Sequence, residues 1–338
     1  MKEAFLGIVG NDGLRRRLCD DILKGTTAHA YILAGQHGSG KHTVALSFAA
    51  ALACENRHQN DLPLPCLACP TCRKIMQGKS PDVIWIGKTG HSVKIEQIRT
   101  LKNDVFTLPN DLEDKIYVIE DADTMTEAAQ NAFLLTLEEP PTFVHFFLLC
   151  ERPEKLLETV RSRAPVLRTE ILPRKDVSAY LLSHSQAASA LAKAKPDELE
   201  EILTMAAGSI GRALELCDEK ERAPLLKRRL LASNFIEMAL AKNYPSLAEL
   251  VVTLPRKKDE LLPILSSVQS ALRDLISLKT ATEPPLIFYT DREIARELAY
   301  SSSTAALCAL SDKISTAIEN LSRNANIHLS LTSLLSKI

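Results

Sequence analysis

A glycine-rich stretch between a strand pattern and a helix pattern constrains this chain most. Residues 35–43 read GQHGSGKHT, close to the phosphate-loop motif G-x-x-x-x-G-K-[ST]. The apolar run 29–35 predicts a buried strand, and residues 41–53 predict a helix. In this order the loop N–H groups turn toward phosphate oxygens at a helix N-terminus. We therefore expect a nucleotide-type loop formed by Gly35, Gly38, Gly40 and Lys41.

His42 is the departure from that motif, because the residue after the lysine normally offers a hydroxyl to Mg²⁺. Magnesium demands oxygen ligands, so an imidazole is a poor substitute. Thr43 carries a hydroxyl, but one further residue along a helix turns its side chain by about 100°. We expect weakened Mg²⁺ coordination here, so that bound ATP with Mg²⁺ is doubtful.

The pattern beyond the loop predicts an α/β domain followed by helices. Further strands are expected at 82–86, 115–121 and 143–150, with helices at 93–106 and 126–139. Alternating strands and helices indicate a parallel sheet covered on both faces. Strand patterns nearly vanish after residue 170. We expect an α/β domain over 1–170, a small helical lid over 171–220 and an all-α collar over 221–338. The charged stretch ending at Pro224 indicates a boundary, and the collar is expected to break near 280–288.

Acidic residues end the strand predicted at 115–121, where Glu120 precedes Asp121. In phosphate-loop ATPases an Asp at this strand end helps to hold Mg²⁺, and a following Glu can polarise the attacking water. The order here is reversed, and catalytic geometry tolerates little displacement. Hydrolysis therefore looks compromised, and a solvated acidic turn is the alternative.

Four of the eight cysteines lie within residues 54–72, with the spacing C-x11-C-x2-C-x2-C. Four thiolates suit a closed tetrahedral zinc site, which leaves no open catalytic position. The ligands would be Cys54, Cys66, Cys69 and Cys72. Free thiols or an iron–sulfur cluster are the alternatives.

Charge and hydropathy exclude little else. The formal net charge of −1 gives no argument for nucleic-acid affinity. No apolar run reaches the roughly 18 residues that span a membrane, and the first 18 residues lack the order of a signal peptide. We expect a cytoplasmic protein with no membrane contact.

Five stretches in order carry a resemblance to the bacterial DNA polymerase III clamp loader subunits of the AAA+ superfamily. They are HAYILAGQHGSGKHT, the cysteine cluster, KIEQIRTL, NAFLLTLEEPPTFVHFFLL and RSRA. The later AAGSIGRALEL and NANIHLSLTSLL extend the resemblance over nearly the full length. It implies a component of the DNA polymerase III holoenzyme that works in DNA replication.

Within that family, three departures lie in the hydrolytic machinery: His42, the Glu120–Asp121 order, and Cys150–Glu151 at the polar sensor position. They resemble the delta prime type, a largely rigid stator, more than the ATP-hydrolysing tau/gamma type. The resemblance implies that Arg163, in RSRA, is an arginine finger acting on the ATP of a neighbouring subunit. It also implies that Arg212 is the nucleotide-sensing arginine of the lid. Their alternatives are a surface arginine and a helix-surface ion pair.

The resemblance further implies partners. They are delta and three tau/gamma subunits in a five-membered ring that loads a sliding clamp onto primed DNA. The collar would join the ring. Two other functions remain open: an active tau/gamma-type ATPase, and a different AAA+ role such as a helicase loader or recombination motor.

Overall fold

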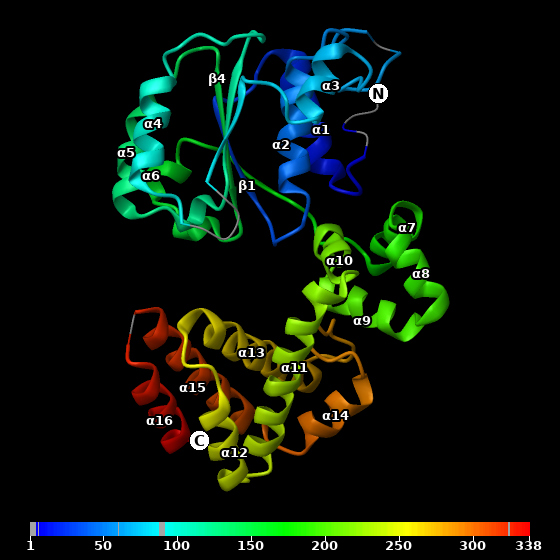
Figure 1. Ribbon diagram of the computed structural model, residues 1–338, viewed down its shortest axis with the longest axis vertical. Coiled ribbons are helices and arrows are strands. Elements are labelled where there is room, and N and C mark those ends of the chain that lie inside the picture. The colour runs from blue at the N-terminus through cyan, green and yellow to red at the C-terminus, as the bar shows by residue number, and fades with distance from the viewer. Residues whose placement is uncertain (1–4, 6, 60, 88–91, 324) are drawn as a thin grey trace. The chain divides into compact units, whose positions relative to one another are not determined.

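The computed structural model describes residues 5, 7–59, 61–87, 92–323 and 325–338. The chain divides into two compact units (Figure 1). Unit 1 comprises Met1–Asp176 with Ser209–Arg212, and unit 2 comprises Val177–Gly208 with Ala213–Ile338. Parts of the stretch compared with a signal peptide (1–4 and 6), and residue 324 of NANIHLSLTSLL, lie outside the described residues. The three domain boundaries given above stay a prediction.

Unit 1 is built on a five-stranded sheet with the order β2-β3-β4-β1-β5, and every neighbouring pair is parallel. Its strands are β1 (Ala30–Ala34), β2 (Val83–Ile86), β3 (Lys115–Ile119), β4 (Val144–Cys150) and β5 (Val166–Arg168). β1, β3 and β4 are buried along their length and are mostly apolar, with Lys115 and His145 as buried polar exceptions. β2, at an edge, is only partly buried.

Helices cover both faces of this sheet (Figure 1). On one face α1 (Asp12–Lys24), α2 (Lys41–Leu52) and α3 (Pro70–Met76) pack on alternate strand residues such as Tyr31, Val118 and Phe147. On the other, α4 (Ile95–Asp104), α5 (Glu127–Glu138) and α6 (Glu158–Arg161) pack on Ile32, Ile119 and Phe146. The predicted α/β fold, with a parallel sheet covered by helices on both faces, is confirmed. The sequence analysis did not identify α1, α3 and β5.

Unit 2 is helical. Its segments are α7 (Arg174–His184), α8 (Gln186–Ala194), α9 (Pro196–Ala206), α10 (Ile210–Leu216), α11 (Glu219–Leu240), α12 (Tyr244–Thr253), α13 (Lys258–Thr280), α14 (Arg292–Tyr300), α15 (Thr304–Ser322) and α16 (Ile327–Lys337), with α7 and α10 each beginning in unit 1. α11 to α16 share one apolar core. The predicted interruption near 280–288 is confirmed, since residues 281–291 join α13 to α14 without regular structure. No helix in the described parts of the chain is long and apolar enough to cross a membrane.

The charged stretch ending at Pro224, which the sequence analysis took as a sign of a domain boundary, lies within α11, because that helix runs through the proline. The boundary itself stays a prediction. A proline inside a helix has no N–H, so one backbone hydrogen bond of the helix is missing. Here side-chain contacts with residues outside the helix stabilise the turn before the proline. The Arg222 guanidinium donates to the Leu216 carbonyl at 3.0 Å and pairs with Glu198 at 2.9 Å. Asp218 caps the helix through its side chain.

Candidate functional site

The carboxyl ends of four parallel strands meet at one edge of the sheet, where open α/β sheets bind their ligands. Gly35 follows β1, and Glu120 follows β3. Cys150 ends β4, and Trp85 is the penultimate residue of β2. The structure therefore brings the predicted loop and acidic residues together at the expected edge.

The loop has the backbone that its glycines predict. Gly38 and Gly40 have φ of 71° and 89°, in the left-handed region that favours glycine. At Gly35 the reason for a glycine is space: the Thr169 side chain packs directly against its Cα, and a Cβ there would lie 1.8 Å from Thr169 Oγ1. That hydroxyl donates to Ser39 Oγ at 2.8 Å. Gly40 caps α2 without any side-chain bond, so the first N–H groups of the helix point into the loop.

Lys41 is folded back on its own loop. Its Nζ donates to the carbonyls of Gly35 at 2.6 Å and Gln36 at 2.9 Å. The side chain is buried, and burial lowers the pKa of Lys41, an effect that the nearby carboxylate of Glu151 opposes. Two carbonyls use two of the three ammonium donors, so one N–H remains for a phosphate oxygen.

His42 makes a contact that the sequence did not predict. Its Nε2 lies 3.0 Å from Glu120 Oε1, and its ring stacks on Trp85 with centroids 5.2 Å apart and planes at 17°. Thr43 is exposed on the next position of α2. Trp85, the only tryptophan of the chain, is thus a site residue that the sequence analysis missed. Its position near the carboxyl end of a predicted strand, where the loop and the acidic residues also lie, could have marked it as a site residue.

The remaining polar groups at this edge are held by the backbone around them. Asp121 has a φ of 45°, and its carbonyl accepts the Thr124 N–H at 2.8 Å. Asp123 accepts the backbone N–H of Arg152 at 3.2 Å. At the sensor position Cys150 is buried, and burial raises its pKa to about 12, so it is a neutral thiol. Glu151 beside it is exposed.

The start of α10 packs against the tip of the loop within unit 1. Gly211 N donates to the Gly38 carbonyl at 2.9 Å, and Ser209 Oγ donates to the His37 carbonyl at 2.8 Å. A Cβ on Gly38 would lie 2.4 Å from the backbone N of Arg212. This places the predicted sensor Arg212 next to the loop, and its own N–H is capped by Ser209.

The four predicted cysteine ligands converge in a buried cluster. The sulfurs of Cys54, Cys66, Cys69 and Cys72 all lie within 4.8 Å of one another. Cys54 follows α2, Cys69 caps α3, and Cys72 lies in its first turn. Tetrahedral zinc with Zn–S bonds of about 2.3 Å requires sulfurs about 3.8 Å apart. The distance of 4.0 Å between Cys66 and Cys72 fits that requirement.

Backbone N–H groups also favour thiolates in this cluster. Cys69 N donates to Cys66 Sγ at 3.4 Å, and Cys72 N donates to Cys69 Sγ at 3.3 Å. Burial acts to raise the pKa of Cys66, but hydrogen bonds from Cys69, Ala68 and Asn56 outweigh it and lower that pKa to about 6. The cluster could therefore bind a metal such as zinc.

Arg163 lies just beyond α6, with its guanidinium at the end of α5. Its Nη2 lies 2.6 Å from Glu138 Oε1, and its Nη1 donates to the Thr159 carbonyl at 2.8 Å. The two charged side chains are 34% and 42% exposed, so solvent reaches both. Glu138 belongs to the LEEPP stretch, and it forms an ion pair with Arg163.

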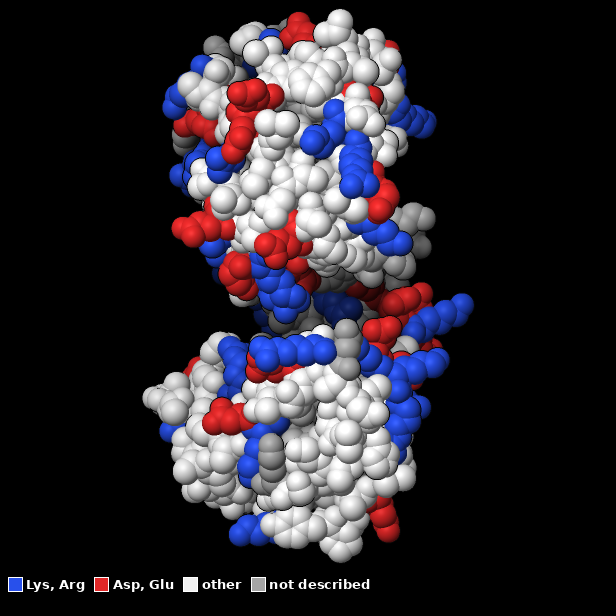
Figure 2. Space-filling view, turned by 90° about the vertical axis from the view of Figure 1, so that its left-hand side faces the viewer, with Lys and Arg blue, Asp and Glu red and all other residues white. Residues whose placement is uncertain are grey.

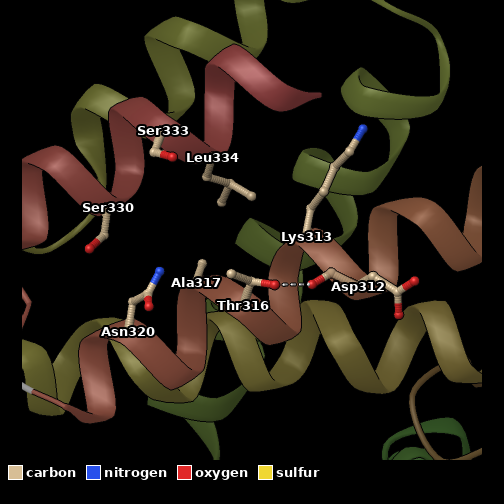
Figure 3. Close-up of a pocket in the computed structure, with 8 residues that line it drawn as sticks. All are labelled: Asp312, Lys313, Thr316, Ala317, Asn320, Ser330, Ser333 and Leu334. Atoms are coloured by element: carbon tan, nitrogen blue, oxygen red, sulfur yellow. Dashed lines mark hydrogen bonds between the residues drawn. The ribbon is translucent and has the colours of Figure 1, made fainter.

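A hollow of about 140 Å³ lies between α15 and α16 (Figure 3). Thr316, Asn320 and Ser330 are among its lining residues. The hydroxyl of Thr316 donates to the Asp312 carbonyl at 2.8 Å, and that of Ser330 donates to the Asn326 carbonyl at 2.9 Å. These donors are used within their own helices, so the hollow is better explained by helix packing than by ligand binding.

Charges on the surface agree with the near-zero net charge. In the space-filling view, acidic and basic side chains are interspersed over the upper unit (Figure 2). Such mixing gives no argument for a nucleic-acid surface on the part of the upper unit that is in view.

Comparisons with known proteins agree on one family. Residues 10–172 match the family model described as "DNA polymerase III, delta subunit". The chain is 31% identical over 217 residues to DNA polymerase III subunit tau of Escherichia coli strain K12, covering 64% of this chain and 33% of that protein. It is 33% identical over 165 residues to subunit delta' of Bacillus subtilis strain 168, covering 49% of each.

A solved structure, a gamma subunit-related protein of Thermotoga maritima, aligns over 95% of this chain and 97% of its own, with 19% identity and a TM-score of 0.47. The chain spans about half or less of the length of the first curated relatives that it matches. Residues 10–172, which contain the phosphate loop and the sheet of unit 1, match this family model and align with delta', tau and gamma proteins, so this part of the chain belongs to the DNA polymerase III clamp loader family.

Proposed function

We propose that this chain is a delta prime-type clamp loader subunit that does not hydrolyse ATP and completes a neighbour's active site. The observation that supports this most is the contact of His42 with Glu120 at 3.0 Å. It joins the residue at the magnesium position of the motif to the acidic strand end. In this arrangement an imidazole replaces the hydroxyl that would coordinate Mg²⁺, and the carboxylate of Glu120 is engaged by that imidazole.

The arginine at 163 supports the second half of the proposal. Its guanidinium contacts Thr159, Ser162 and Glu138 through its terminal nitrogens, and the side chain is one-third exposed. An arginine finger must leave such a surface ion pair to reach a phosphate of another subunit. Exposed pairs cost about 0–1 kcal/mol to break, so the exchange for a phosphate contact is favourable.

Partners and cofactors follow from the family. We propose that the chain assembles in the cytoplasm with delta and tau/gamma subunits in a five-membered ring, and acts through it on the sliding clamp and primed DNA. Residues 171–220 would form the lid and 221–338 the collar of that ring. Zinc would be structural, held by the four buried cysteines.

The test is ATP turnover by a loader reconstituted with and without Arg163→Ala in this chain. An arginine finger contributes roughly 10³-fold or more to the site it completes, so the share of DNA-dependent turnover from that one site should vanish. Assembly, followed by size-exclusion chromatography, should be unchanged. Arg161→Ala is the matched control, because Arg161 is an exposed arginine two residues away. Equal turnover in the two variants would reject the assignment.

The second candidate is an active tau/gamma-type ATPase, which the 31% identity to tau over 217 residues favours. Turnover of ATP by the isolated chain decides between them. Turnover that Lys41→Ala abolishes would establish the active ATPase, and its absence supports the delta prime type.

A further inference from the structure

The residues at the magnesium position do not fit magnesium. An imidazole is not among the oxygen ligands that Mg²⁺ prefers. A ring nitrogen that donates its proton to Glu120 has no lone pair for a metal, and the Glu120 oxygen 3.0 Å away is engaged by the same contact. Asp121 follows Glu120 in a left-handed backbone conformation with a φ of 45°, and the carboxylate of Asp123 accepts the N–H of Arg152. Magnesium would have to break contacts that the protein already makes.

The contact between His42 and Glu120 is supported from a third side. The ring of His42 stacks on Trp85 at 5.2 Å, and Trp85 is in register with Val118 of the neighbouring strand β3. Glu120 follows that same strand, and its side chain is only 16% exposed. Imidazole, indole and carboxylate therefore come from three adjacent elements, α2, β2 and the end of β3. The sheet fixes two of them, so the arrangement is built into the fold.

The phosphate-binding half of the loop is retained beside this closed metal position. Gly38 and Gly40 keep the left-handed backbone. Lys41, 7% exposed, keeps one ammonium donor beyond its two loop carbonyls. Backbone N–H groups at a helix N-terminus bind phosphate oxygens without a metal.

We propose that this loop binds the phosphates of a nucleoside di- or triphosphate without a divalent cation, with His42 and Glu120 satisfying each other where the metal's ligands would lie. The proposal deepens the proposed function, since a subunit that does not hydrolyse ATP needs no cation to activate water. The two can fail separately, because one concerns binding and the other turnover.

The experiment measures the affinity of the full chain for a fluorescent ATP analogue, with magnesium present and with magnesium omitted. Affinity in the two conditions should agree within about twofold for the unaltered chain. His42→Thr, which restores the hydroxyl of the motif, should bind at least roughly tenfold more tightly with magnesium than without it. His328→Thr changes an exposed histidine of α16 and should behave as the unaltered chain. Lys41→Ala should lose binding in both conditions.

Three results would overturn the proposal. One is a tenfold or larger gain in affinity when magnesium is added to the unaltered chain. Another is the absence of binding in both conditions, and the third is binding that survives Lys41→Ala. Turnover measured in the same samples separates the two proposals, because none of these results requires the chain to hydrolyse ATP.

Discussion

At the scale of single residues, this protein uses carboxylates in opposite ways. Glu120 contacts an imidazole, whereas two other carboxylates, Asp82 and Asp274, are fully buried and accept backbone N–H groups. Asp274 holds the connection before α14 through the N–H groups of residues 287–289. Buried charges of this kind must be satisfied by hydrogen bonds. Here they fix loops.

Asp82, just before β2, provides a test of that role. Its oxygens accept the N–H groups of Asn110 at 2.7 Å, Asp111 at 2.7 Å and Leu112 at 3.0 Å. Burial acts to raise the pKa of Asp82, but these N–H groups outweigh it and hold the pKa below its usual range. Asp82→Asn should cost about 1–3 kcal/mol in the free energy of unfolding at neutral pH.

The pH dependence follows from the lowered pKa. The stabilisation is present above about pH 4, the ordinary value for Asp, and is lost as the pH falls through the lower folded value. Urea unfolding of the two proteins should therefore show a difference that narrows in acid. Asp259→Asn, at an exposed aspartate, is the control. A difference that stays constant with pH would contradict the assignment.

At the scale of elements, the phosphate loop is held by its contact with the start of α10. Gly38→Ala would place a Cβ 2.4 Å from the Arg212 backbone N, in addition to the strain of a positive φ. Gly40→Ala has the same kind of strain, with nothing within 4 Å of the added Cβ. We expect Gly40→Ala to cost roughly 1–2 kcal/mol and Gly38→Ala clearly more. Thermal unfolding of both variants measures the loss of stability. An equal loss in the two variants would mean that the contact between Gly38 and the start of α10 is not tight.

The cysteine cluster is an element that one metal ion would complete. Metal analysis of the purified chain should give about one zinc per molecule, and Cys69→Ser should lose it together with thermal stability. Cys308→Ser removes an exposed thiol of α15 and should keep the zinc. Metal-free protein with unchanged stability, purified without a chelator, would exclude a structural zinc site.

Sequence patterns predicted elements well where one physical signal dominates. Buried strands such as β3 and β4 are mostly apolar runs, and the phosphate-loop motif predicts the strand and the helix that flank it. β5 has three residues and exposes two of them, so no run marks it. The sequence did not reveal that α11 continues through Pro224, because the contacts of Arg222 outweigh the local preference of proline. Pairwise contacts such as His42 with Trp85 depend on strand order, which periodicity does not contain.

At the scale of the whole molecule, the chain has separate cores. Those of unit 1 lie on the two faces of the sheet, and the core shared by α11 to α16 contains only residues from 231 onward. A domain needs its own core to fold alone. The fragment 219–338 should therefore unfold cooperatively when followed by circular dichroism. A gradual, featureless melt would show that it depends on the rest of the chain.

The helix α2 has a consequence for any experiment on metals. It begins at the phosphate loop and ends two residues before Cys54, so about 18 Å of one helix joins the two sites. The cluster cysteines also share a core with Phe48 of that helix. A strong chelator added to strip magnesium would also draw zinc from the cysteines and disturb the loop from its far end. Chelation would then imitate a magnesium requirement, which is why magnesium should be omitted rather than sequestered.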